Sequence, residues 1–159
     1  MKARAVLIPL LLAAGTAVHA APPACEGTLS GAVTARFACT VVLATQPDGV
    51  TYLVIHGSAP IEGIPSYAPG AFEIPGPVAE RTYTLDTLGM GRASVAAEGG
   101  TLYMASKTSA QRGEVTLVLL RVIKDPAAPG TFVAHGTYRA RLLPVGAGKP
   151  GEVVVDVRF

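Results

Sequence analysis

The sequence predicts an all-β fold, an antiparallel β-sandwich of about eight strands with one disulfide, and a small β-barrel is the alternative. Short segments in which apolar and polar residues alternate recur along the chain, and turns rich in glycine and proline separate them. No convincing amphipathic helix follows residue 20. The chain after residue 20 therefore forms one all-β domain, residues 21–159.

The first strong strand is expected at 34–44, where Phe37, Cys39, Val41 and Leu43 share one face. A Pro-Asp-Gly turn then leads into a returning strand at 50–56. Later strands are expected at 81–85, 92–97, 101–106, 114–123, 131–143 and 153–159.

Two of these later segments allow a more detailed prediction. Segment 114–123 is apolar at most positions, which indicates a central strand covered on both faces. In the C-terminal segment Val153, Val155, Val157 and Phe159 alternate with more polar positions. We expect those four side chains to face the core.

Segment 57–79 is different because its five prolines argue against a regular central strand. It is nevertheless too apolar for a free linker. The preferred interpretation is a loop that covers one end of the core, and the alternative is a partner-binding loop. Ile64, Tyr67, Phe72 and Ile74 are the candidate binding residues of that loop.

Residues 1–20 have the layout of a secretory signal peptide, with Lys2 and Arg4 before an apolar run and small residues before Ala20. The protein is therefore expected to be secreted or periplasmic. The chain has 13 Lys and Arg against 11 Asp and Glu, and removal of Lys2 and Arg4 makes the totals equal. A neutral chain without a cationic cluster argues against nucleic acid as a partner. No apolar run after Ala20 has the length of a transmembrane helix.

Cys25 and Cys39 are the only cysteines of the sequence. In an exported protein they are expected to form an intramolecular disulfide. The closed loop of about 15 residues would contribute about 3 kcal/mol in the chain-entropy model. A free thiol pair or an intermolecular bridge is the alternative.

Few residues suggest chemistry. His56 and His135 lack the third ligand that a zinc site needs, so neither a metal nor a cofactor is expected. His56-Gly57-Ser58 does not establish the geometry of a Ser-His catalyst. Arg139 and Arg141 share one strand face and could grip an anionic ligand, although such a pair is more often a solvated face.

Several short segments occupy turn and strand positions: Cys25-x-Gly27, Phe37-x-Cys39, Gly100-Thr101-x-Tyr103, Arg112-Gly113-Glu114-Val115-Thr116-Leu117 and His135-Gly136-Thr137. This pattern resembles small exported β-rich proteins of unknown function from soil bacteria of the myxobacterial kind. The resemblance spans most of the chain after residue 20. It implies a fold and a compartment and brings no activity or site with it.

These observations favour a non-catalytic binding or structural module of the cell envelope or extracellular space, whose partner is an unknown protein or envelope component. A small outer-membrane β-barrel protein is the alternative, because the alternating C-terminal strand ends in Phe159. A secreted hydrolase is the third hypothesis, and the absence of a visible acid/base pair argues against it.

The signal-peptide interpretation predicts where the exported chain begins. N-terminal sequencing of exported material should start at Ala21 or within a residue or two, because the apolar run and the small residues before Ala20 place the cleavage there. An intact Met1 in the exported fraction would contradict the prediction.

Overall fold

The computed structural model describes residues 24–146 and 150–159, and these residues form ten antiparallel strands and no helix. The signal peptide expected at residues 1–20 lies outside the described residues. The strands are β1 (Cys25–Gly31), β2 (Ala35–Thr45), β3 (Thr51–Gly57), β4 (Ser66–Ile74), β5 (Thr82–Thr84), β6 (Gly91–Ala96), β7 (Leu102–Ser106), β8 (Glu114–Lys124), β9 (Thr131–Pro144) and β10 (Val153–Arg158).

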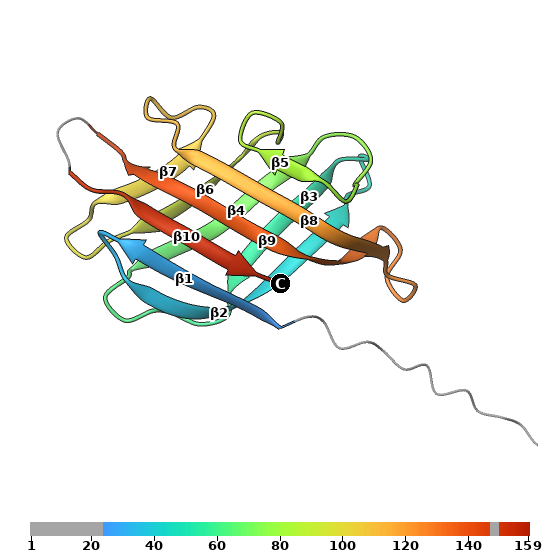
Figure 1. Ribbon diagram of the computed structural model, residues 1–159, viewed down its shortest axis with the longest axis horizontal. Helices are drawn as coiled ribbons and strands as arrows, with labels where there is room; N and C mark the ends of the chain where they lie inside the picture. Colours follow the sequence, from blue (N-terminus) through green and yellow to red (C-terminus); the bar gives the residue numbers. More distant parts are fainter. Residues whose placement is uncertain (1–23, 147–149) are drawn as a thin grey trace, which may run out of the picture.

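Eight of the strands close into a barrel, in the order β1-β2-β3-β4-β6-β7-β9-β10 and back to β1 (Figure 1). The two remaining strands are attached outside this ring, β8 along β9 and β5 along β8. Strand β9 has 14 residues and pairs with four strands. One of its edges holds β10 and β2, and the other holds β8 and β7.

The prediction of an all-β antiparallel fold with one disulfide is confirmed. The architecture is the alternative barrel and not the preferred sandwich, because β9 and β10 complete the ladder between β7 and β1. Alternation along a strand shows that one face is buried, and this holds for a sandwich as well as for a barrel. The sequence pattern therefore could not decide between them.

The inward faces of the strands form one apolar core. In β10 the side chains of Val153, Val155 and Val157 are buried, whereas that of Arg158 is exposed, so the predicted register is confirmed. Phe159, which follows the strand, is also buried. The largest fully buried side chains are Tyr83, Tyr138, Phe72, Leu29, Leu43, Leu53, Ile55, Ile74, Leu88, Leu117, Leu119 and Leu142.

The first strand, β1, was not predicted as a strand. Its buried positions Cys25, Gly27 and Leu29 alternate with exposed ones, and it lies between β10 and β2 in the barrel wall. Cys25 and Cys39 are direct register partners with Cα atoms 4.9 Å apart, and they form the predicted disulfide. The bond therefore fixes the register of β1 against β2 at one end of the pair.

The expectation that segment 57–79 contains no regular central strand is wrong. Residues Ser66–Ile74 form β4, which pairs with β3 on one side and β6 on the other. Proline is tolerated there because the ladder to β6 is interrupted between Ala68 and Ala71, and Pro69 lies inside that irregularity. The other prolines of the segment lie outside the strand.

An interior hydrogen bond connects opposite walls of the barrel at this irregularity. The Tyr138 hydroxyl on β9 donates to the carbonyl oxygen of Pro69 at 2.8 Å. Gly70 makes room for the ring, since a Cβ there would lie 2.8 Å from the Tyr138 hydroxyl oxygen. Burial raises the pKa of the Tyr138 hydroxyl, so it remains protonated and keeps its role as donor.

The prediction that 114–123 is covered on both faces is also wrong. Strand β8 alternates between buried and exposed positions in its first half, and Leu120 and Ile123 are exposed. Thr116, Val118 and Leu120, which are not buried, are apolar or β-branched, and this made the segment look buried on both faces. Part of its outer edge is covered, since the backbone N–H of Val122 donates to the Glu80 carboxylate at 3.1 Å, beside a bulge between Leu119 and Arg121.

The register of β10 predicts unequal effects for two neighbouring substitutions. Val155→Asp should lower the free energy of unfolding by about 3 kcal/mol or more, because it buries a carboxylate without a partner. Val154→Asp, on the outward face, should change it by about 1 kcal/mol or less. Urea titration measures both, and equal losses would contradict the assigned register.

The bond between Tyr138 and Pro69 predicts a measurable loss when only the hydroxyl is removed. Tyr138→Phe should cost about 1–3 kcal/mol, because the Pro69 carbonyl loses its donor inside the core. Tyr52→Phe is the matched control, since the hydroxyl of the half-buried Tyr52 makes only a long hydrogen bond of 3.4 Å to Glu73. Thermal unfolding of both variants checks the difference, and a silent Tyr138→Phe would show that the bond contributes nothing.

Candidate functional site

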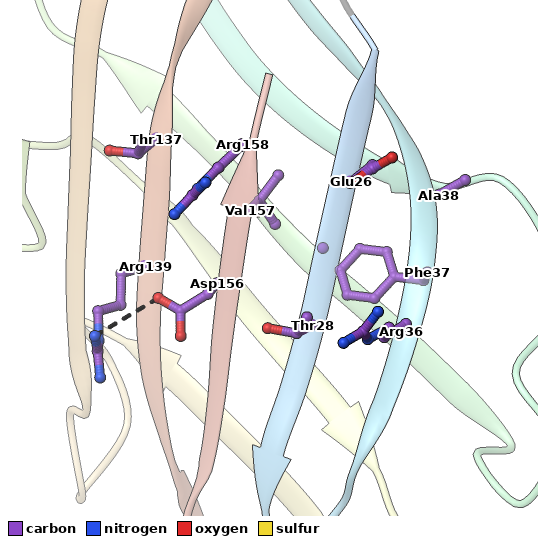
Figure 2. A pocket seen from close by; sticks show the side chains of 11 residues that line it. Glu26, Thr28, Arg36, Phe37, Ala38, Thr137, Arg139, Asp156, Val157 and Arg158 are labelled. Carbon is purple, nitrogen blue, oxygen red and sulfur yellow. Dashed lines mark ion pairs between the residues drawn. The ribbon is translucent and has the colours of Figure 1, made fainter.

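An open groove of about 870 Å³ lies on the outer face of the barrel, across the neighbouring strands β9, β10, β1 and β2. We call it the outer groove, and Figure 2 shows it from close by. Its lining residues are Glu26, Gly27, Thr28, Arg36, Phe37, Ala38, Thr137, Arg139, Asp156, Val157 and Arg158.

Strand register arranges the outward side chains of the groove in two rows. The first row crosses the four strands as Arg36, Thr28, Asp156 and Arg139. The second row crosses them as Ala38, Glu26, Arg158 and Thr137. Cationic, anionic and hydroxyl side chains therefore alternate over one continuous part of the wall.

The charges of the groove are only partly paired. Arg139 forms an ion pair with Asp156 at 3.7 Å, drawn as a dashed line in Figure 2. Arg36 and Arg158 are exposed and have no ion-pair partner within 4.0 Å among residues 24–146 and 150–159. In Figure 2 the Arg36 side chain reaches from β2 toward β1, and that of Arg158 reaches from β10 toward β9.

Arg141, the neighbour of Arg139 on the same face of β9, forms ion pairs with two carboxylates. Its guanidinium lies 2.6 Å from Glu152 and 3.3 Å from Glu114. The hydrogen bond to Glu152 is the main cause that raises the pKa of Arg141. Arg141 does not line the groove, so of the two arginines singled out in the sequence only Arg139 belongs to it.

Gly27 forms part of the groove floor and lets the wall close tightly. Phe37 on β2 is the register partner of Gly27, and its ring packs against the glycine. A Cβ at Gly27 would lie 2.2 Å from the Cζ of Phe37. The same ring contacts Tyr67 edge to face, with centroids 5.4 Å apart. The floor of the groove therefore rests on the buried ring of Phe37, which packs against the half-buried Tyr67.

A second, smaller opening of about 230 Å³ lies near the end of the barrel where β1 begins and β10 ends. The disulfide Cys25–Cys39 and Phe159 line it, together with residues of β2 and the first part of β9. Both cysteines are buried. The described residues that line it are mainly apolar, and Asp125 is the one charged residue among them.

The four candidate residues of segment 57–79 do not come together at the surface. Ile64, Phe72 and Ile74 are buried in the core. Tyr67 is half-buried, and its hydroxyl donates to the carbonyl oxygen of Ala59 at 2.6 Å. Phe72 and Ile74 belong to the wall strand β4, so the segment is not simply a loop over one end of the core, and its role as a partner-binding loop stays a prediction.

Neither of the two histidines lines the outer groove. His56 is exposed on β3 opposite Thr40, and His135 on β9 lies opposite Arg121. Among the residues that the structure describes, no group of three or more His, Cys, Asp or Glu could hold a metal ion.

Sequence reasoning missed most of the groove. Glu26 and Thr28 were overlooked because β1 was not recognised, although Cys25, Gly27 and Leu29 already alternate with polar residues. Arg158 is one of the polar positions that alternate with the core-facing residues of the C-terminal segment, and it is exposed, but its neighbours were unknown. Only the pairing of N-terminal with C-terminal strands brings these side chains together.

Comparisons with known protein families, with curated proteins and with solved structures found no match to this chain. No helix in the described part of the chain is long and apolar enough to cross a membrane. The geometry of the outer groove is therefore the basis for the functional interpretation.

The disulfide beside the smaller opening predicts a stability loss. The double variant Cys25→Ala, Cys39→Ala should have a free energy of unfolding about 3 kcal/mol lower than that of the native protein, because the closed loop no longer restricts the unfolded chain. Adding a reductant should destabilise the native protein and leave the double variant unchanged. A native protein that is insensitive to full reduction would contradict the prediction.

Proposed function

We propose that this protein is an exported, non-catalytic binding module of the cell envelope or extracellular space, and that its ligand lies in the outer groove. The observation that carries the proposal is the pair of exposed guanidinium groups of Arg36 and Arg158, which have no ion-pair partner among the described residues. Guanidinium groups bind carboxylate and phosphate oxygens in a fixed, bidentate geometry.

The size and rigidity of the groove support a binding role. Its volume of about 870 Å³ is within the range of ordinary ligand sites. Strands β1 and β10 run along its centre, and each is paired with a neighbour on both sides. The backbone positions that carry the groove side chains are therefore fixed before a ligand arrives, which lowers part of the entropic cost of binding.

Export is supported by two independent features. The Cys25–Cys39 disulfide is consistent with an oxidising compartment, where such bonds persist. The pattern of residues 1–20 is typical of a secretory signal peptide.

The composition of the groove favours binding over catalysis. The described residues that line it include the hydroxyls of Thr28 and Thr137 but no histidine. A hydroxyl nucleophile needs a base within hydrogen-bond reach. Asp156, one of the two carboxylates, lies in an ion pair with Arg139.

The orientation of side chains supports this proposal over the outer-membrane alternative. The barrel interior is apolar, whereas Arg36, Asp156 and Arg139 stand on the outward face near the middle of the wall. An outer-membrane barrel has an apolar outward band, and a lipid-facing arginine at its centre costs about 2–4 kcal/mol. The outward face of this wall is suited to water.

The proposal is tested by obstructing the groove. Thr28→Trp places a large ring at its centre, and Ser94→Trp places the same ring on the outward face of β6 as the control. The immobilised native protein should retain an envelope component in the absence of detergent, Thr28→Trp should lose it, and Ser94→Trp should keep it. Equal retention by both variants, or none by the native protein, would overturn the proposal.

A further inference from the structure

We infer that the ligand of the outer groove is an acidic oligosaccharide, a chain of sugars that carries carboxylates on more than one of its units. This inference rests on the proposed binding role of the groove. It comes from the combination of hydrogen-bonding groups in the two rows of outward side chains.

The groove offers donors and acceptors side by side. Arg36 and Arg158 can only donate, whereas ionised Glu26 and Asp156 can only accept, and the threonine hydroxyls do both. A complementary ligand must bring anionic oxygens to the arginines and hydroxyl donors to the carboxylates. A chain of uronic acids carries both groups on every sugar ring.

The spacing of the two free arginines requires an extended ligand. Arg36 lies on β2 and Arg158 on β10, with β1 between them, and they belong to different rows. Strand spacing and residue rise place their Cα atoms about 12 Å apart. The first row spans about 14 Å from Arg36 to Arg139. One small anion cannot bridge the two guanidinium groups without help from the flexible side chains, whereas carboxylates that recur along a chain reach both.

Other anionic ligands fit the groove less well. A polyphosphate offers no hydroxyl donors, so its charges would meet Glu26 and Asp156 with repulsion. An extended peptide that adds a strand needs a free sheet edge. Strands β1 and β10 offer none along the groove, because register partners flank both of them.

Calorimetric titration of the exported protein with four defined compounds tests the inference. Hexagalacturonate provides carboxylates and hydroxyls, maltohexaose provides hydroxyls alone, and hexaglutamate provides carboxylates alone, with tripolyphosphate as a compact anion. We expect hexagalacturonate to bind most tightly and more weakly as salt rises. Arg36→Gln and Arg158→Gln should each weaken it about tenfold, the effect of a lost hydrogen bond to a charged group.

Arg121→Gln is the matched control, because Arg121 is an exposed arginine of β8 that does not line the groove, and it should bind as the native protein does. The inference is overturned if hexagalacturonate does not bind, if any of the other three compounds binds as tightly, or if Arg121→Gln weakens binding as much as the groove variants. If Thr28→Trp still abolishes retention of an envelope component, the binding role stands and only the ligand class fails. Recovery of shortened sugar chains would instead contradict the non-catalytic role.

Discussion

The pairing of β9 along both of its edges is the constraint on which the rest of the structure depends. This strand closes the barrel by joining β10 and β7, and its other contacts hold β8 outside and β2 at one end. Its inward residue Tyr138 crosses the interior to Pro69, and its outward residues Thr137 and Arg139 form one side of the outer groove. The core and the candidate site thus share one strand, whose alternation assigns successive residues to each.

The parts of the fold that local pattern determines were predictable. The alternation of β10 identified its buried face, and two cysteines in a chain that was expected to be exported indicated the disulfide. Strand β4 could not be foreseen because Pro69 normally argues against a central strand, and only the irregularity opposite β6 accommodates it. Coverage of β8 was overestimated because apolar residues occupy its outward positions as well.

The candidate site could be predicted only in fragments. Arg139 was considered, together with Arg141, either as part of a solvated face or as a grip for an anion, but its neighbours Asp156 and Thr28 come from strands at opposite ends of the sequence. Which outward residues become neighbours depends on the order and register of strands around the barrel, and no local spacing encodes that order. Charged and hydroxyl side chains that indicate no function individually become neighbours in one groove through this pairing.

The Glu80 carboxylate that accepts the Val122 N–H has a consequence beyond this chain. Strand β8 is outside the closed ring, and the part of it that extends past β5 would otherwise offer a strand edge to another molecule. The carboxylate occupies one of its donors, the bulge beside Arg121 bends the edge, and the charges of Arg121 and Lys124 repel a like copy. This edge is therefore less suited to pairing with a strand edge of a second copy, which is the contact through which fibres grow by strand addition.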